Sequence, residues 1–253
     1  VLVINANSGS VGEFSMLCRY HNDRQVAAGK WLKENTNESA IVATHDVGAI
    51  AFYGERKIID IAGLVTPELI AHLNDRLYSE YLNKYLGESK VDYLITLRNW
   101  FEVVNDIPVY IPVNEMEYLE IYKYDPEQTH IQPKEVSQLN QAAIQMLQNG
   151  NAPNSVSYLN QSLMLDRKSS QTYFILGVVY EAMREYPKAE SNFNKAIDLH
   201  SEYTEAWYGL AKSNFDQKKY EEAFYYVNKC LLLNSNYKPA TQLKDQLEPL
   251  IQD

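Results

Sequence analysis

The stretch that decides the fold is residues 172–201, TYFILGVVYEAMREYPKAESNFNKAIDLHS. Its apolar residues recur at helical spacing on both sides of a break at residues 185–187, which predicts two helices joined by a short turn. Antiparallel helices cross closely where one presents a small side chain, so we expect Gly177 to face Ala189, with Phe193 filling the space beside them. One hairpin cannot bury its apolar face alone, and neighbouring hairpins are therefore required.

The same pattern recurs 34 residues further along the chain and 34 residues back. Counting from Gly177 reaches Ala211 in one direction and Ala143 in the other, so small residues return at the expected crossing points. Large apolar residues return beside them in the same register, at Leu139, Tyr173 and Trp207 and at Leu159, Phe193 and Val227. The agreement of three copies in one register predicts a repeat array.

From Pro133 to the C-terminus the chain resembles the tetratricopeptide repeat family, most clearly in the second copy. The first copy is degenerate, with Met146 where Tyr180 would fall and Ser162 where Ala196 would fall. The resemblance implies an all-α superhelix of three repeats, at about 136–169, 170–203 and 204–237, followed by a capping helix at 238–252.

Composition and charge limit the classes of function. The 253 residues carry a net charge of −10, which argues against a nucleic-acid partner because such proteins need a basic face. Residues 1–132 hold 11 basic and 19 acidic residues and residues 133–253 hold 12 and 14, which favours two domains divided at that point. No cluster of Cys and His has zinc spacing and no apolar run could span a bilayer, so we expect no metal, cofactor or membrane helix in this chain.

Residues 1–132 predict an α/β domain, a small mixed sheet with flanking helices. An apolar run at 1–4 is followed by a Gly/Ser loop at 5–12, which lacks the residues of a phosphate-binding loop. The remaining expected elements are a helix from His21 to the polar run 34–39, strands at 40–44, 57–61, 91–97, 109–113 and 118–124, a helical turn at 47–52, one or two helices at 67–86, a short helix at 99–105, and a linker at 125–133.

Several motifs in this domain resemble the soluble C-terminal domain of bacterial lipid-linked-sugar glycosyltransferases, the dolichyl-phosphate-mannose type. They are Trp31, His45-Asp46-Val47-Gly48, Glu55-Arg56, residues 60–65 (DIAGLV), Pro67-Glu68 and Asp92-Tyr93-Leu94. The resemblance implies that the chain is the extracytoplasmic tail of a bacterial membrane protein whose active site lies upstream. The start at Val1 agrees with a piece of a longer protein. We therefore expect this chain to be non-catalytic, and the alternative is a free-standing cytoplasmic scaffold.

The residues that most suggest chemistry are His45 and Asp46, at the carboxyl end of one expected strand, and Asp60, at the end of the next. Catalytic groups favour that edge of an open α/β sheet, and nearby acid and base groups can exchange protons. The rival hypothesis is thus a carbohydrate-active enzyme or sugar-binding domain that uses these three residues. The structural alternative is that His45 and Asp46 cap a turn while Asp60 holds backbone amides of the following loop.

In the repeats, the first helix of each hairpin is expected to line the concave groove. The predicted groove residues are Asn140, Ile144, Phe174, Val178, Glu181, Tyr208, Lys212 and Phe215. Ile144 and Val178 stand where a clamp for a peptide carboxylate would need polar groups, so we expect an apolar or aromatic peptide, or a helix of a partner protein. The leading hypothesis is a protein-interaction module, and the alternative is that the repeats serve only packing or dimerisation.

Overall fold

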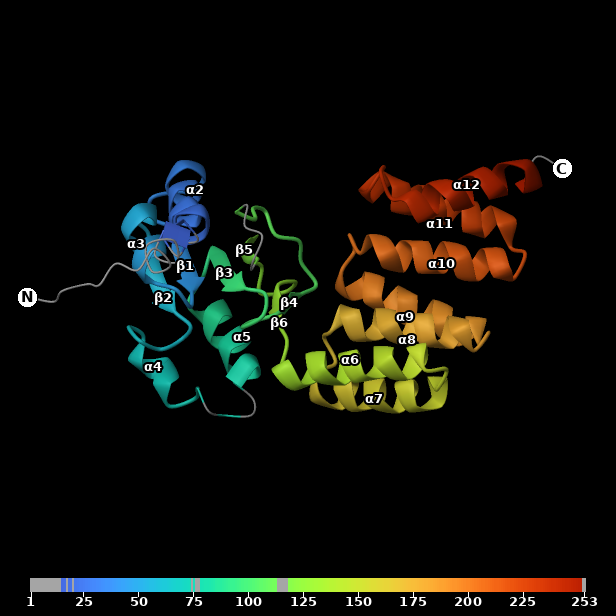
Figure 1. Cartoon of the computed structure of the whole chain (residues 1–253), viewed down its shortest axis with the longest axis horizontal. Helices are drawn as coiled ribbons and strands as arrows, with labels where there is room; N and C mark the ends of the chain where they lie inside the picture. Colours follow the sequence, from blue (N-terminus) through green and yellow to red (C-terminus); the bar gives the residue numbers. More distant parts are fainter. Residues whose placement is uncertain are drawn as a thin grey trace, which may run out of the picture. The chain divides into compact units, whose positions relative to one another are not determined.

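The computed structural model describes residues 15–16, 18–19, 21–73, 75, 78–112 and 118–251. The apolar run expected at residues 1–4 and the loop expected at 5–12 lie outside these residues. The chain divides into two compact units, the first formed by Val1–Glu102 and Ile107–Ile131, the second by Val103–Asp106 and Gln132–Asp253 (Figure 1). This division differs from the predicted one, because Val103–Asp106 belong with the second unit.

The first unit is built around a four-stranded sheet of order β2-β1-β3-β5. Strands β1, β2 and β3 are parallel, and β5 runs antiparallel to β3, so the predicted small mixed sheet is confirmed. The strands are β1 (Ile41–Thr44), β2 (Lys57–Asp60), β3 (Tyr93–Leu97) and β5 (Leu119–Lys123), with the short β6 (His130–Ile131) after them. The helical elements are the π-helix η1 (Asn22–Val26), α2 (Ala27–Asn35), α3 (Gly48–Gly54), α4 (Pro67–Ile70) and α5 (Tyr78–Glu88).

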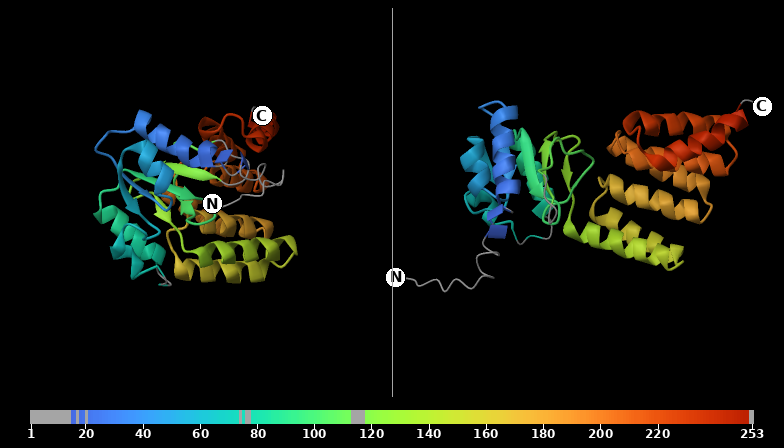
Figure 2. Two further views of the ribbon diagram at one scale, coloured as in Figure 1. Left: turned by 60° about the vertical axis from the view of Figure 1, so that its left-hand side comes forward. Right: turned by 45° about the horizontal axis from the view of Figure 1, so that its top comes forward.

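The core of this unit forms where α2 and α3 pack against one face of the sheet (Figure 2). Leu32 of α2 and Ile50 of α3 are fully buried against Val42 and Ile95 of the two central strands. Alternate residues of β1 and β3 point to this face, as the two-residue period of a strand requires. The buried runs of these strands explain why the sequence alone locates them.

Two predicted elements of the first unit are wrong. The helix expected at residues 99–105 is absent; a turn follows β3 there, and Val103–Val104 form the short strand β4. The β-branched pair favours an extended backbone, and Asn105 has a positive φ of 71°, which ends any helix. The strand expected at 109–113 is reduced, over its described residues, to one bridge between Tyr110 and Ile121.

The second unit consists of three helical hairpins and a final helix, as the tetratricopeptide pattern predicts. The hairpins are α6 (Lys134–Gln148) with α7 (Ala152–Leu165), α8 (Ser170–Ala182) with α9 (Tyr186–Leu199), and α10 (Thr204–Asp216) with α11 (Tyr220–Leu233), followed by α12 (Lys238–Ile251). Helices α8, α10 and α12 begin at residues 170, 204 and 238, so the repeat of 34 residues is kept through the capping helix. Successive first helices lie against one another along the array (Figure 1).

The crossing in the second hairpin brings Gly177 onto the ring of Phe193, which was expected to fill the space beside it. An added Cβ at Gly177 would lie 2.5 Å from two of the ring carbons. The other neighbour of that ring is Gly209 of α10, where a Cβ would lie 2.6 Å from it. Phe193 is fully buried, so one ring joins two hairpins through two glycines.

The turn inside each hairpin contains one residue in the left-handed region, again 34 positions apart. These residues are Gly150 (φ 75°), Arg184 (φ 59°) and Lys218 (φ 62°). Only the first copy uses glycine, which adopts this conformation without steric cost. Arg184 and Lys218 therefore hold strained backbone that the surrounding hairpins impose.

A short segment distant in sequence completes the turn between the first two hairpins. Asn105 is only 4% exposed, and its amide donates to the carbonyl of Lys168 (2.6 Å) and accepts from the amide of Ser170 (3.0 Å). Both contacts lie within the second unit, in which Asn105 supplies hydrogen bonds to the backbone where α7 ends and α8 begins. The second unit is thus discontinuous in sequence.

Candidate functional site

The first helices of the hairpins carry apolar side chains that are only partly buried. Ile144 on α6 is 38% exposed, and Phe174 and Val178 on α8 and Tyr208 and Phe215 on α10 are half-buried. Since α6, α8, α10 and α12 contact one another in succession, these side chains come from one continuous row of helices. These five of the eight predicted groove residues are here called the groove surface.

Asn140 does not belong to this surface, which corrects the prediction. It is 2% exposed, and its amide bonds to the hydroxyl of Thr172 on α8 at 3.0 and 3.1 Å. Thr172 also contacts Ser169 and so ties the start of α8 to α6. The helical register places Asn140 correctly on α6, but the polar partner on α8 draws it into the interface between the two helices.

The aromatic rings of the groove surface are each supported by a second ring. The ring centroids of Phe174 and Tyr203 are 5.1 Å apart, and those of Tyr208 and Tyr237 are 5.5 Å apart in an edge-on arrangement. The ring centroids of Phe215 and Tyr220 are 5.9 Å apart. Such neighbours hold the rings in place, so the surface is preformed and a ligand would not have to order it.

Of the remaining two predicted groove residues, Lys212 forms ion pairs with the other, Glu181, and with Asp216. The Lys212 ammonium donates to Glu181 and, at 3.0 Å, to Asp216. Burial acts to lower the pKa of Lys212, but these two hydrogen bonds outweigh it and raise the pKa above its ordinary value. The lysine charge is therefore already shared by two carboxylates, and this part of the groove surface cannot clamp a third one.

The three residues of the rival hypothesis lie at the carboxyl edge of the sheet, as predicted. Asp60 is fully buried, and its carboxylate accepts from the backbone amides of Ala62 and Val65, both at 2.8 Å. This is the role that the structural alternative assigned to it. Asp46 accepts from the Gln25 amide at 2.7 Å, and the His45 ring lies 5.1 Å from Trp100.

Burial lowers the pKa of His45 despite the opposing effect of the Asp46 carboxylate, so the imidazole is neutral near pH 7. Tyr78 donates to the carbonyl of Ile61 at 2.5 Å, and burial together with Asp60 raises the pKa of Tyr78 to about 12. Sequence reasoning did not find Gln25, Trp100 or Tyr78 at this edge, because they come from segments with no catalytic pattern.

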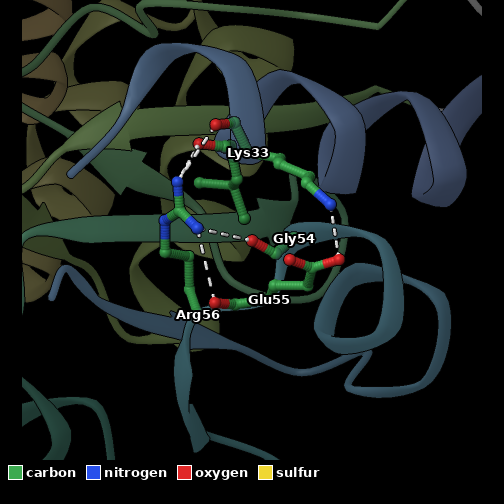
Figure 3. Close-up of polar contacts among 5 residues, drawn as sticks. Lys33, Gly54, Glu55 and Arg56 are labelled. Atoms are coloured by element: carbon green, nitrogen blue, oxygen red, sulfur yellow. Dashed lines mark hydrogen bonds and ion pairs between the residues drawn. The ribbon is translucent and has the colours of Figure 1, made fainter. Parts of the chain in front are cut away.

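Arg56, part of the glycosyltransferase-like motif, has a structural task (Figure 3). Its guanidinium donates to the carbonyl oxygens of Leu32, Lys33 and Thr36, where α2 ends, and to that of Gly54 at the end of α3. The positive charge satisfies the last carbonyl groups of two helices, and at the helix C-termini it also interacts favourably with the helix dipoles. An open pocket of about 560 Å³ lies beside this arginine and is lined by Lys33, Thr36, Glu38, Glu55 and Arg56.

No group of three or more His, Cys, Asp or Glu residues in the described part of the chain is arranged to hold a metal ion. Over the same residues, no helix is long and apolar enough to cross a membrane.

These features define a protein with tetratricopeptide repeats and a small α/β unit. A family model described as "Domain of unknown function (DUF8728)" matches residues 17–225, and the chain belongs to this family. Among curated proteins it is 27% identical over 78 residues to "Anaphase-promoting complex subunit 3" of Schizosaccharomyces pombe. That match covers 31% of this chain and only 12% of the length of that relative.

Solved structures similar to the chain are tetratricopeptide domains. The first such domain of Spaghetti (RPAP3), bound to the HSP90 peptide SRMEEVD, is 19% identical with a TM-score of 0.46 over 47% of this chain and 95% of that one. The Sgt2 domain from Aspergillus fumigatus is 16% identical with a TM-score of 0.46 over 48% and 82%. The Yersinia enterocolitica chaperone SycD is 15% identical with a TM-score of 0.45 over 47% and 95%. None of these matches supports the resemblance to membrane glycosyltransferases.

Proposed function

We propose that this protein is a protein-interaction module whose groove surface binds an apolar or aromatic segment of a partner protein. The observation that carries the proposal is the row of half-buried apolar side chains on α6, α8 and α10, held in place but not covered by the described residues. Repeat arrays of this kind present extended concave surfaces for binding, because each helix pair is rotated slightly against the last.

The charges of the groove surface favour the apolar ligand over an anionic one. Lys212 is paired with Glu181 and Asp216, so this trio carries a net negative charge. A peptide carboxylate placed here would meet two carboxylates for one ammonium, and like charges at close range oppose binding. Aromatic rings such as Tyr208 and Phe215 instead offer large contact areas to apolar side chains.

A selection from a peptide library displayed on phage tests this proposal, with the full chain as the target. We expect the recovered peptides to be rich in apolar and aromatic residues. Their affinity should fall at least about tenfold for the double variant Tyr208→Ala/Phe215→Ala, since truncating central aromatic residues costs more than about 1 kcal/mol each at an interface. Circular dichroism of the variant would show that the helices are intact.

A matched control removes two exposed apolar side chains from α11, a second helix of its hairpin. Tyr225 is 55% exposed and Leu232 is 81% exposed, and their double alanine variant should bind the peptides as the unmodified chain does. Peptides that bind equally to the groove variant, or that are lost in the α11 control, would show that the groove surface is not the binding site. A stable dimer formed through the groove surface would favour the packing alternative.

The sequence further predicts that the module belongs to a membrane glycosyltransferase on the extracytoplasmic side of a bacterial membrane. This stays a prediction, and the reading frame upstream of the Val1 codon tests it. A series of apolar segments of about 20 residues each would support the membrane context. A start codon a few positions upstream would refute it and leave the cytoplasmic alternative.

A further inference from the structure

Helix α10 carries charged and aromatic side chains along one face. This row, here called the α10 row, comprises Glu205, Tyr208, Lys212 and Asp216. Its members are three or four residues apart, so their side chains are neighbours on the helix surface. The Lys212 ammonium donates to Glu181 of α8, and Glu181 therefore faces the same side. The α10 row thus continues onto α8 and includes the Tyr208 ring of the groove surface.

The α10 row and its neighbour on α8 hold more negative than positive charge. Together α8 and α10 carry three carboxylates, those of Glu181, Glu205 and Asp216, and one ammonium, that of Lys212. Lys212 is paired with Glu181 and Asp216. Glu205 is exposed and forms no hydrogen bond or ion pair with a described residue. The two helices therefore present an excess of negative charge that no side chain of their own balances.

Two tyrosine rings lie within this excess of negative charge. The rings of Tyr208 and Tyr237 meet edge-on with centroids 5.5 Å apart, and both residues are half-buried. Burial raises the pKa of Tyr208, Lys212 opposes that shift, and the two carboxylates bound to Lys212 add to it. Burial also raises the pKa of Tyr237, and the Glu205 carboxylate raises it further. Carboxylates thus act on both phenol groups.

An aromatic ring beside carboxylates is an environment that favours an organic cation. The ring quadrupole attracts a cation placed over its face. Carboxylates at short range add a Coulomb attraction, which is stronger at a partly buried site than in bulk water. The long aliphatic stems of Lys and Arg can cover apolar side chains while their charged heads stay close to the carboxylates. A neutral or acidic side chain would gain neither of the two electrostatic attractions.

The equivalent positions of the earlier hairpins are apolar. Counting back 34 residues from Lys212 reaches Val178 on α8 and then Ile144 on α6. Of the residues that form α8, only Glu181 near its end is charged. The row of first helices therefore changes from apolar side chains on α6 and α8 to aromatic and acidic ones on α10. A segment bound along these helices would meet the two kinds of surface at different points of its length.

We propose that the segment bound by the groove surface carries a Lys or Arg side chain, which lies against the rings of Tyr208 and Tyr237 next to Glu205. An apolar side chain of the same segment contacts α6 and α8. The partner is thus a protein with a segment that is both basic and apolar. This inference rests on the proposed function, since it names the ligand class of the same surface.

Peptides selected from the phage library on the full chain are the probes. Each is resynthesised with its Arg residues replaced by citrulline or its Lys residues by acetyl-lysine, changes that remove the charge and largely keep the shape. We expect the selected peptides to contain Lys or Arg, and one such replacement to weaken binding about tenfold. Added salt should weaken binding of the charged peptide and have little effect on the neutral one.

The variant Glu205→Gln tests where the cation binds. It should reduce the difference in affinity between the charged and the neutral peptide at least about threefold, because one of the attracting charges is gone. Folding should be unaffected, since Glu205 is exposed and has no bonded partner among the described residues. The matched control is Glu221→Gln, which removes an exposed carboxylate from α11 and should leave the difference unchanged.

The outcomes separate this inference from the proposed function. The inference is overturned, and the proposed function stands, if neutral peptides bind as tightly as charged ones while Tyr208→Ala/Phe215→Ala still weakens both. The same conclusion follows if Glu205→Gln and Glu221→Gln have equal effects. If no selected peptide depends on Tyr208 and Phe215, the proposed function and the inference both fail.

Discussion

The substitution Gly177→Ala tests the packing of the two hairpins around Phe193. The new Cβ would lie 2.5 Å from Cδ1 and Cε1 of the ring and 2.9 Å from Cζ. Carbon atoms in contact are normally about 3.5–4.0 Å apart, so the methyl group overlaps the ring by about 1 Å. The ring has little room to retreat, because the backbone of α10 faces it so closely at Gly209 that a Cβ added there would lie 2.6 Å from the ring.

Two effects oppose each other in this variant. Alanine favours a helix over glycine by about 1 kcal/mol, whereas overpacking a tight core costs about 1–3 kcal/mol. Because the contact falls on ring carbons in a fully buried position, the cost should lie at the upper end of that range. We expect the free energy of unfolding of the second unit to fall by about 2 kcal/mol in all.

Urea unfolding followed by far-ultraviolet circular dichroism measures this change. A double-mutant cycle with Phe193→Leu should show a favourable coupling of about 1 kcal/mol or more, because the smaller side chain leaves room for the methyl group. Gly48→Ala is the control, since a Cβ there meets no atom within 4 Å and stability should not fall. A Gly177→Ala variant as stable as the unmodified chain would refute the reasoning.

Three further predictions concern other features of the two units. Arg56→Ala should lower the unfolding free energy of the first unit by about 2–3 kcal/mol, because several helix-end carbonyls lose a charged donor. If urea unfolding showed no change beyond error, water would have replaced the guanidinium as the donor. Lys218→Gly should raise the stability of the second unit by about 1 kcal/mol and Gly150→Ala should lower it by a similar amount, since only glycine is unstrained at positive φ; thermal unfolding would reveal the opposite sign if the turns were adaptable. The pKa of His45 is lowered from its ordinary value of 6.5 by burial, so the unfolded chain binds the proton first, and stability should be full above pH 6.5 and fall as the pH decreases below it. His45→Gln should remove that part of the pH dependence in urea titrations, and an unchanged slope would assign it to other groups.

The repeat array could be predicted closely because its determinants are local and periodic. The helix starts at residues 170, 204 and 238 follow from a spacing that each copy confirms. The contact of Phe193 with Gly209 in the next hairpin was not predicted, because one hairpin considered alone cannot show it.

The first unit was less predictable because its determinants are not periodic. The buried strands β1, β2 and β3 were found from their apolar runs, and the backbone contacts of Asp60 were anticipated from its position at a strand end. The π-helix was not, since η1 lies at the start of a segment whose apolar pattern predicts one ordinary helix. The contact of Gln25 with Asp46 carries no signal in the sequence, because the two residues are 21 positions apart.

The discontinuity of the second unit bears on how such a chain is made and inherited. Asn105 is synthesised more than sixty positions before Lys168 and Ser170, the residues that it braces, so during translation Asn105 has no partner until the ribosome has added the turn between α7 and α8. A gene fusion that transferred only residues 132–253 would leave the brace behind. The family model spans residues 17–225 and so covers both Asn105 and the turn that it braces.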